Sequence, residues 1–478
     1  MSGDFFGRED LLDDLSALWR KKVASLVTCR GRRRIGKSTL IEKFAQRSKA
    51  RFIKIEGLRP KASLGNADEL ANFAAQLSAQ CGTESTPPAR WLDAFIRLAG
   101  EVEDDGRTVV LLDEVSWMAH FDATFAGTLK IAWDNYFKNH PRLVLVVCGS
   151  VSTWIRENII DDGAFYGRRS LDVIVPELPL RECVKFWGKA AERIDLREII
   201  DVLSVTGGVP RYLEEIDPGV SANENIRRLC FRPKSILRVD FDEMFADVIS
   251  SLPTLAAKVV RALAGGGLTT AEIADKLGQG KNGHISAALD QLVESGMVSA
   301  DTGMNPATGR PARIKRYRLK DNYSRFYLKY IESEKDAIDK GAFAFVSLEQ
   351  LDGWDAVLGL AFENLVVNNV RSLLAPLGLS STLLTSCAPY SQRGTRYGGV
   401  QIDLLLQSRR SVFAIEIKRK REIGREIIDE MAEKVKRLPH RKGISVRTAL
   451  IYDGHLSPGV EADGYFGAIV EFKTLLGL

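Results

Sequence analysis

The sequence GRRRIGKST, at residues 31–39, has the residue types and spacing of a loop that binds phosphate groups. Gly31 and Gly36 allow the backbone to turn tightly, so that successive amide groups point inward towards an anion. Lys37 would reach the outer phosphates of ATP, and the Ser38 hydroxyl would hold a bridging Mg²⁺ ion. The expected nucleotide-binding residues are Gly31, Arg34, Ile35, Gly36, Lys37, Ser38 and Thr39.

The segments on either side of this loop suit that interpretation. An apolar strand is expected at Val23 to Thr28, and the helical pattern after the loop carries Leu40, Ile41 and Phe44. The N-terminus of such a helix places the positive end of its dipole at the phosphates. The alternative is a glycine turn beside a solvated basic run at Arg30 to Arg34. That alternative leaves the placement between strand and helix unexplained.

Two carboxylates follow a second apolar strand. Residues Arg107 to Glu114 read RTVVLLDE, and a continuous apolar run is what a central parallel strand buried on both faces requires. Asp113 would fix the magnesium ion through its water shell, and Glu114 would polarise the attacking water, unless the pair only caps the next helix. A further apolar strand, Leu143 to Cys148, ends beside Ser150, which either senses the terminal phosphate or belongs to a simple turn.

A second group of charged residues interrupts apolar strands in the last third of the chain. Asp403 lies in one expected strand, and Glu416 and Lys418 lie in the next. Glu416 and Lys418 share a face because side chains alternate along a strand. Asp403 lies opposite Glu416 if the turn is centred between residues 409 and 410, and a slip of one residue would turn its carboxylate away.

Charged residues of these types can act on a phosphodiester. In magnesium-dependent nucleases, two carboxylates hold the metal beside the scissile phosphate while a lysine lowers the pKa of the attacking water. Charges buried in apolar strands are costly unless they are paired or bound to metal. The alternative for Asp403, Glu416 and Lys418 is an ion-paired hairpin on a fold that binds without cutting.

Length and composition limit the class of protein. The 478 residues have room for about three domains of about 150 residues each. Hydrophobic residues make up 45% and charged residues 27%, which excludes a largely disordered chain. The net charge of +5 does not by itself require nucleic acid, and the six cysteines form no CxxC pair that would indicate a zinc site. Because no apolar run approaches the length needed to cross a bilayer, we expect a cytoplasmic protein with no membrane partner.

Three further motifs accompany the phosphate-binding loop. Residues 5–9 read FFGRE, residues 166–169 read YGRR, and residues 207–210 read GGVP. Together with the loop they resemble the P-loop ATPases described mostly from Archaea, which are relatives of the AAA+ and STAND NTPases. The resemblance covers nearly the whole chain and is most specific at residues 31–39.

This resemblance implies roles for three of these elements. Residues 5–9 would lie against the adenine, Arg168 would act as an arginine finger on the transferred phosphoryl group, and Arg211 would sense the nucleotide from a helical lid. A finger that acts in trans would require a homo-oligomer. The plainer alternatives are a stapled helix N-terminus, a surface arginine pair and a routine proline at a first helical turn.

The last third resembles the nuclease-like domain of unknown function at the C-terminus of the same ATPases, whose members read FE, EID and EvK. Glu363, Asp403, Glu416 and Lys418 match those motifs. The resemblance implies a metal site at Glu363, Asp403 and Glu416, with Asp403, Glu416 and Lys418 as catalytic residues. The glutamate often found two residues before the aspartate is Gln401 here, a departure that puts metal binding in doubt.

A different pattern begins near Ser250. A helix at Leu255 to Leu263, a capping box of Thr269 and Glu272, a further helix and two strands around a loop indicate a winged helix-turn-helix. Basic residues of the wing suit contact with DNA phosphates: Arg313, Lys315, Arg316, Arg318 and Lys320.

The expected recognition helix argues against sequence reading. Asp290, Gln291 and Glu294 lie on its free face, and the only positive charge nearby is Lys281, before the helix. Carboxylates in a major groove would be repelled by the phosphates. We therefore favour non-specific duplex contact or a structural connector over the reading of a defined site.

The expected fold class is α/β in four parts. These are a P-loop NTPase parallel sheet at 1–175, a helical lid at 176–248, a winged helix at 249–330 and a PD-(D/E)xK nuclease-like domain at 331–478. The function expected is Mg²⁺-dependent ATP hydrolysis that uses Lys37, Ser38, Asp113 and Glu114. The nucleotide state would position the winged helix and the last domain on DNA, which the last domain would cleave with a metal ion. The alternative is an ATP-gated scaffold or signalling switch whose last domain binds nucleic acid or protein without cutting.

Overall fold

The structure is a computed structural model of the chain, and it describes residues 5–103, 105–150, 152–248, 253–280, 283–392, 394 and 398–478. Residue 249, where the third predicted domain begins, and Lys281 lie outside the described residues. The chain forms two compact units, Met1–Glu177 and Leu178–Leu478, each of which is described by itself. Among the described helices, none combines the length and the apolar character that a bilayer-spanning helix needs.

The first unit is built on a five-stranded sheet in which all neighbouring strands are parallel, in the order β2-β3-β4-β1-β5. The strands are β1 (Ser25–Arg30), β2 (Arg51–Glu56), β3 (Thr108–Asp113), β4 (Leu143–Gly149) and β5 (Arg169–Ile174). β3 and β4 are buried along their whole length, which confirms the prediction made from their apolar runs.

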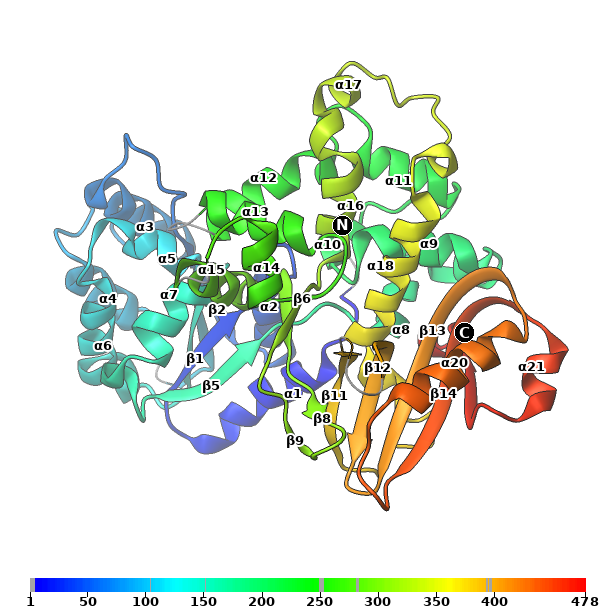
Figure 1. Ribbon diagram of the computed structural model, residues 1–478. Coiled ribbons are helices and arrows are strands. Elements are labelled where there is room, and N and C mark those ends of the chain that lie inside the picture. Colours follow the sequence, from blue (N-terminus) through cyan, green and yellow to red (C-terminus); the bar gives the residue numbers. More distant parts are fainter. Residues whose placement is uncertain are drawn as a thin grey trace. The chain divides into compact units, whose positions relative to one another are not determined.

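Helices pack against this sheet (Figure 1). Residues of β2, β3 and β4 share one apolar core with α3 (Asn66–Cys81), α4 (Trp91–Gly100) and α6 (Phe125–Asn135). The helix α2 (Lys37–Arg47) contacts β2, β3 and α1 (Glu9–Ala17). The shorter helices of this unit are η1 (Leu18–Lys21), α5 (Val115–Met118), η2 (Ala119–Phe121), η3 (Phe137–Asn139), α7 (Ser152–Ile155), η4 (Arg156–Ile160) and η5 (Gly163–Phe165).

The second unit begins with a helical segment. It contains α8 (Leu180–Cys183), η6 (Val184–Glu192), α9 (Leu196–Thr206), α10 (Pro210–Leu213), α11 (Ala222–Cys230) and α12 (Ile236–Val248). Three more helices follow: α13 (Pro253–Leu263), α14 (Thr270–Lys276) and α15 (Gly283–Glu294). The predicted capping box at the start of α14 is confirmed, because Thr269 Oγ1 accepts from the Glu272 amide at 3.2 Å and the Glu272 carboxylate accepts from the Thr269 amide at 2.7 Å.

A small antiparallel sheet accompanies these three helices. Its strands, in the order β6-β10-β7, are β6 (Leu268–Thr269), β10 (Arg316–Leu319) and β7 (Val298–Asp301). Between β7 and β10 the chain forms a separate two-stranded ladder of β8 (Met304–Asn305) and β9 (Arg310–Pro311).

The second unit ends in a mixed five-stranded sheet, orange to red in Figure 1. Its strands, in spatial order, are β11 (Leu384–Gln392), β12 (Val400–Ser408), β13 (Ser411–Ile423), β14 (Ser445–Leu456) and β15 (Ala468–Glu471). β11, β12 and β13 pair antiparallel, whereas β13, β14 and β15 pair parallel. The β13 strand therefore has an antiparallel neighbour on one side and a parallel neighbour on the other.

Helices precede and interrupt this sheet. They are α16 (Asn322–Tyr330), η7 (Glu332–Glu334), α17 (Lys335–Asp339), η8 (Leu348–Gln350), α18 (Trp354–Asn368), α19 (Val370–Leu373), α20 (Glu426–Arg437), α21 (Pro458–Asp463) and α22 (Lys473–Leu476). α20 buries Ile427 and Met431 in one apolar core with β12 and β13. α18 contacts β13, and the centroid of its Phe362 ring lies 4.7 Å from the ring centroid of Phe472.

The segments 178–248, 253–330 and 331–478 belong to one compact unit. Side chains join them: Arg419 of β13, for example, binds Asp201 of α9. Their division into a lid, a winged helix and a nuclease-like domain therefore stays a prediction.

Candidate nucleotide site and carboxylate cluster

The phosphate-binding loop connects β1 to α2, as predicted. Gly31 has a φ of +150°, and a Cβ added there would lie 2.6 Å from the carbonyl oxygen of Val175. Gly36 has a φ of +81° and is the N-cap of α2. Glycine is required at both positions, because of the close approach at the first and the left-handed backbone at the second.

Lys37 is the first residue of α2 and is buried, with 6% of its surface exposed. Its ammonium donates to the carbonyl oxygens of Gly31 at 3.1 Å and Arg32 at 3.2 Å, and to Ser150 Oγ at 3.2 Å. The positive charge therefore lies inside the loop, bonded to neutral oxygen atoms that a phosphate oxygen could replace.

Ser38 and Asp113 meet as the sequence predicts. Ser38 Oγ donates to Asp113 Oδ2 at 2.6 Å, because the parallel strands bring the end of β3 to the edge of the sheet where α2 begins. A hydroxyl and a carboxylate oxygen are ligands that suit Mg²⁺. The side chains at this position therefore fit the metal that the motif implies.

Lys54 of β2 belongs to this site and was not predicted. Its ammonium lies 3.1 Å from Asp113 Oδ2 and 3.1 Å from Glu56 Oε2. Burial lowers the pKa of Lys54, but the charges of Asp113 and Glu56 outweigh that effect and raise the pKa overall. The parallel register that pairs Glu56 with Asp113 is the signal that would have revealed it.

Glu114 and Ser150 are bonded to each other. Ser150 donates its amide to Glu114 Oε2 at 3.1 Å and its hydroxyl to Glu114 Oε1 at 2.6 Å. Glu114 has a left-handed backbone, with φ of 50°, and is the N-cap of α5, although its side chain makes no capping bond. Lys37, Ser150 and Glu114 thus form one hydrogen-bonded chain at the carboxyl ends of β1, β3 and β4.

The FFGRE motif contacts the loop itself. The Arg8 guanidinium donates to the carbonyl oxygens of Ile35 at 2.5 Å, Gly36 at 3.4 Å and Pro176 at 3.3 Å. Of the other predicted loop residues, Ile35 is buried, Arg34 has a left-handed backbone, and Thr39 is exposed on α2. Arg8 therefore fixes the last turn of the loop through its carbonyl groups.

Arg168 lies at the end of the sheet where β1 begins, opposite to the end that carries the phosphate-binding loop. It precedes β5, whose Arg169 pairs with Leu26 near the start of β1, whereas the phosphate-binding loop follows the end of β1. At about 3.3 Å per residue, the length of the strand separates the two by roughly 13 Å. Arg168 therefore does not reach the loop of its own chain, and only a role in trans stays a prediction.

The guanidinium of Arg168 has a partner within the first unit. It binds both carboxylate oxygens of Asp134, at 2.7 and 2.9 Å, and the carbonyl oxygen of Ala164 at 2.8 Å. The hydrogen bonds from Arg168 lower the pKa of Asp134 to about 2. Arg211, the predicted sensor, belongs to the second unit and pairs with Glu214 at 3.2 Å and Glu215 at 2.6 Å, directly after the end of its own helix.

The register between the strands that carry Asp403 and Glu416 is the one expected for a turn centred between residues 409 and 410. Leu404 of β12 pairs with Ile415 of β13, so the next residues outward along the ladder are Asp403 and Glu416. Asp403 Oδ2 accepts a hydrogen bond from the Ile417 amide at 2.8 Å. The aspartate is therefore held by the backbone of the strand that carries its predicted partners.

Glu416 is neutralised by two lysines. It is fully buried, and its carboxylate oxygens accept from Lys434 Nζ at 2.7 and 2.6 Å, while Lys418 Nζ lies 2.9 Å away. Lys434 was not predicted, although it follows Ile427 and Met431 at helical spacing on the face of α20 that is turned to the sheet.

The carboxyl groups of Glu363 and Asp403 have raised pKa values. Burial, then the charges of Asp403 and Glu416, raises the pKa of Glu363 to about 7. Burial, then the charge of Glu416, raises the pKa of Asp403 to about 6. In the described part of the chain, no three His, Cys, Asp or Glu side chains are grouped so that they could hold a metal ion. The predicted ligand set is therefore not assembled as a three-carboxylate centre, and Glu416 binds two lysines instead.

The basic residues around β10 do not form one exposed surface. Arg313 and Lys315 are exposed. Arg318 points inward and binds Asp301 at 2.9 Å and Asn368 at 2.9 Å. Arg316 donates to the carbonyl oxygen of Gly267 at 2.5 Å. Of the basic residues predicted to contact DNA here, the exposed ones are therefore Arg313 and Lys315, between β9 and β10.

Comparisons with known proteins agree with the nucleotide site. Residues 5–216 match a family described as an ATPase domain predominantly from Archaea. The "Uncharacterized protein MJECL04" of Methanocaldococcus jannaschii is 24% identical over 362 residues, 75% of each chain.

Comparison with solved structures finds a similar fold in one protein and a weaker likeness in another. The Walker-type ATPase PABY2304 of Pyrococcus abyssi has a TM-score of 0.51 at 16% identity, over 68% of this chain and 97% of that one. The ORC2 protein of Aeropyrum pernix, in ADPNP-ADP complexes, has a TM-score of 0.42 at 15% identity, over 72% of this chain and 96% of that one. The family match and the parallel sheet agree, and residues 5–216 are similar to an ATPase domain of the archaeal type.

Proposed function

We propose that this protein hydrolyses ATP with Mg²⁺ at the N-terminal site, and that its nucleotide state controls DNA binding and metal-dependent DNA cleavage by the C-terminal sheet. The observation that carries the nuclease half is the register that sets Asp403 opposite Glu416, with Lys418 on the same face. The family and the fold already support ATP binding and hydrolysis by the first part of the chain.

At the nucleotide site each side chain has a role that its contacts support. Lys37 would exchange its bonds to carbonyl oxygens for bonds to the outer phosphates. Ser38 and Asp113 would hold Mg²⁺, which neutralises charge on those phosphates. Glu114, oriented by Ser150, would accept the proton of the attacking water. An arginine in trans, Arg168 of another copy, would complete the site only in a homo-oligomer.

At the carboxylate cluster, Glu363 and Asp403 would bind a divalent metal, with Glu416 as the third ligand once Lys434 gives way. The metal would supply a water molecule of lowered pKa and charge to stabilise the phosphate. Lys418, 2.9 Å from Glu416, would orient that water. Asp403 is already fixed by the Ile417 amide, so the strand pair positions it for this role.

Contacts between α9 and β13 support coupling between the two activities. Arg419, next to Lys418, binds Asp201 of α9. Arg197, also on α9, donates to the carbonyl oxygen of Lys420 at 3.0 Å. A shift of α9, which lies inside the family match, would therefore move the strand that carries Glu416.

The segment from α13 to β10 supports a winged helix that contacts DNA without reading its sequence. Its three helices and three-stranded sheet have the required order, and Arg313 and Lys315 are exposed in the loop between β7 and β10. Lysine and arginine at such a position bind phosphates and set affinity rather than specificity.

Nicking of supercoiled plasmid with Mn²⁺ or Mg²⁺, with and without ATP, tests the proposal. We expect the parent protein to nick the plasmid, and Asp403→Asn and Lys418→Ala to lose activity by at least about 100-fold. Glu433→Gln, which alters an exposed carboxylate of α20, is the matched control and should keep full activity. Equal nicking by the parent and Asp403→Asn would refute a metal site at this sheet.

A second candidate function is binding without cleavage. The two lysines on Glu416 favour it, because an ion-paired cluster is stable without metal. Under this alternative the protein is an ATP-gated scaffold or signalling switch. Nucleotide-dependent binding of plasmid DNA or protein, with no nicking under any metal or nucleotide, would support it.

A further inference from the structure

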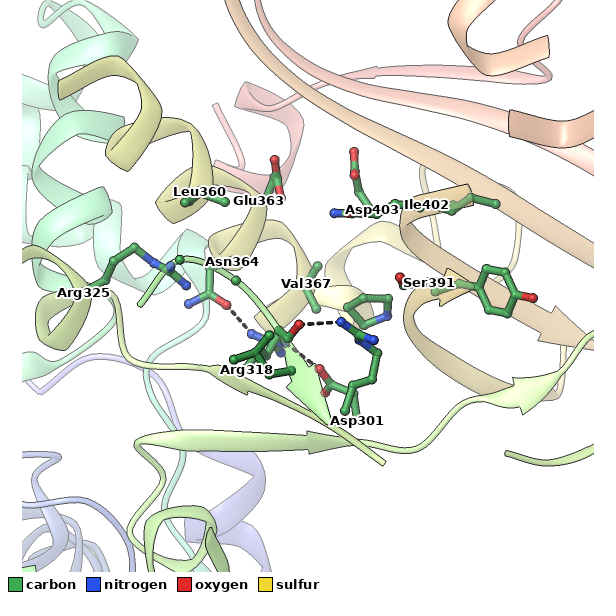
Figure 2. A pocket seen from close by; sticks show the side chains of 18 residues that line it. Asp301, Arg318, Arg325, Leu360, Glu363, Asn364, Val367, Ser391, Ile402 and Asp403 are labelled. Atoms are coloured by element: carbon green, nitrogen blue, oxygen red, sulfur yellow. Dashed lines mark hydrogen bonds and ion pairs between the residues drawn. The ribbon is translucent and has the colours of Figure 1, made fainter. Parts of the chain in front are cut away.

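A cavity of about 270 Å³ lies within the second unit and opens beside the carboxylate cluster. It is bordered by α18, β11 and β12, by residues 265–268, by β7 and β10, and by Arg325 of α16. Figure 2 shows Glu363 and Asp403 at one end of this cavity and the Arg318–Asp301 pair at the other.

Arg325 is a buried cation with no carboxylate partner. Arg325 is 5% exposed. Among the described residues, no carboxylate oxygen lies within 4.0 Å of its guanidinium nitrogens, the limit for an ion pair. Its terminal nitrogens donate to the carbonyl oxygens of Ala264 and, at 3.5 Å, Leu319, whereas its Nε has no hydrogen-bond partner. Burial lowers the pKa of Arg325 to about 10, and the charge of Glu363 offsets that effect only in part. An anion from outside the chain would therefore stabilise this arrangement.

The other two arginines of the cavity differ from Arg325. Arg318 pairs with Asp301 at 2.9 Å and bonds to Asn364 and Asn368. Arg316 lies 3.5 Å from Glu272 and donates to a backbone carbonyl. Both already have carboxylate partners. Arg325 is therefore the cation of this cavity that is best suited to an added anion.

The size of the cavity limits the ligand. Its volume of about 270 Å³ is close to the lower end, about 300 Å³, of the range for small-molecule sites. The cavity therefore suits a ligand no larger than about one nucleotide unit. A duplex, whose major groove alone is about 12 Å wide, cannot enter it. Single strands differ from duplexes in that their nucleotides can be separated and turned into a pocket one at a time.

We infer that this cavity is a subsite for one phosphate-bearing nucleotide of an unpaired DNA strand, with Arg325 binding the phosphate beside Glu363 and Asp403. The inference rests on the proposed function, because those two carboxylates are its metal ligands. It deepens that function by assigning the substrate: the C-terminal sheet acts on unpaired DNA, such as single-stranded ends, gaps and the short regions that negative supercoiling opens in a plasmid, rather than on relaxed duplex. A free nucleoside monophosphate shares the same chemistry and would compete for the site.

Binding of a fluorescent oligothymidylate to the full-length protein, measured by anisotropy, tests the inference. We expect Arg325→Gln to weaken single-strand binding by about tenfold or more, and Arg325→Lys to restore part of it. The slope of log affinity against log salt should also fall by about 0.7 in Arg325→Gln, since one phosphate contact is lost. Arg447→Gln, an exposed arginine of β14, is the matched control and should bind as the parent does.

A second variant protects the test against a loss of folding. Ser391→Phe fills the cavity from β11 without touching the bonds of Arg325, and we expect it to weaken single-strand binding while thermal unfolding stays close to that of the parent. Competition by thymidine monophosphate should be lost in both variants. If competition is strong but oligothymidylate binding does not depend on Arg325, the cavity serves free nucleotides and the inference is overturned.

Single-strand binding and plasmid nicking, measured side by side, separate this inference from the proposed function. Parent-like single-strand binding by Arg325→Gln and Ser391→Phe, with nicking intact, would overturn the subsite and leave the nuclease. Absence of nicking in the parent, with single-strand binding that depends on Arg325, would overturn the nuclease and support the subsite.

Discussion

The two charged sites of this chain balance their charges in different ways. At the nucleotide site the Lys37 ammonium is bonded to neutral oxygen atoms, and Asp113 lies against a serine hydroxyl and Lys54. In the carboxylate cluster Glu416 is fully buried between Lys418 and Lys434. A phosphate can reach Lys37 in the first site by replacing bonds to neutral oxygen atoms, whereas a metal that binds Glu416 in the second must displace two ion pairs.

The difference follows from how each site is built. The first site uses one loop whose glycines and backbone geometry lie within nine residues, together with the ends of two neighbouring strands. The second draws its side chains from α18, β12, β13 and α20, which are far apart in sequence. Groups from separate elements need ion pairs to hold them together, so removing one charge should destabilise the second site more than the first.

Glu416→Gln gives the largest expected change in stability. The substitution leaves Lys418 and Lys434 without their common carboxylate, and a broken buried ion pair costs about 3–5 kcal/mol. We expect the lower end, about 3 kcal/mol, because both lysines keep part of their surface in water. Urea unfolding measures this change. Glu433→Gln, on the exposed face of α20, should shift the free energy of unfolding by less than about 0.5 kcal/mol.

Lys37→Ala should remove ATP turnover and leave the second site intact. Loss of one preorganised cation at the phosphates slows hydrolysis by at least about 100-fold, or about 2.7 kcal/mol. Release of inorganic phosphate under saturating ATP measures it. Lys43→Ala, an exposed lysine on the same helix, is the matched control. Unchanged turnover in Lys37→Ala would mean that the loop does not bind the reacting phosphates.

The nucleotide site could be predicted because its information is local. Gly31, where a side chain would meet a carbonyl oxygen, and Ser38, at the start of a helix, both belong to the loop motif itself. The register of β12 and β13 could be predicted only up to the centre of their short turn, since a shift of that centre changes which residues face each other.

Other residues could not be predicted, because they depend on which elements pack together. Lys434 contacts Glu416 only because α20 lies over β13, and Arg325 faces a cavity whose walls come from separate segments. Arg168 belongs to a recognisable motif, but the motif does not say at which edge of the sheet its strand begins. These residues gain their role from tertiary packing, which a short motif does not contain.

Gly31→Ala tests how tightly the loop depends on its backbone. The added Cβ would lie 2.6 Å from the Val175 carbonyl oxygen at a φ of +150°, so we expect a loss of about 1–3 kcal/mol in the free energy of unfolding. Gly127→Ala is the control in α6, where an added Cβ meets no atom within 4 Å. It should stabilise the protein by about 0.5–1 kcal/mol, because alanine loses less entropy in a helix. Equal effects of the two substitutions would show that the loop tolerates a side chain.

Asp134→Asn gives the smallest expected change and tests the ion pair at the far edge of the first sheet. Arg168 lowers the pKa of Asp134 from 3.8 in the unfolded chain to about 2, so the pair stabilises the fold above about pH 4 and the stabilisation disappears as the pH falls towards 2. Both side chains are partly exposed, at 30% and 21%, so the contribution should be under about 1 kcal/mol. Free energies of unfolding of the parent and of Asp134→Asn should therefore differ by a constant amount near pH 7 and converge near pH 2. A difference that persists at pH 2 would show that Asp134 acts through packing. An ATPase rate that falls in Arg168→Gln and rises with protein concentration in the parent would instead assign Arg168 to the site of a neighbouring copy.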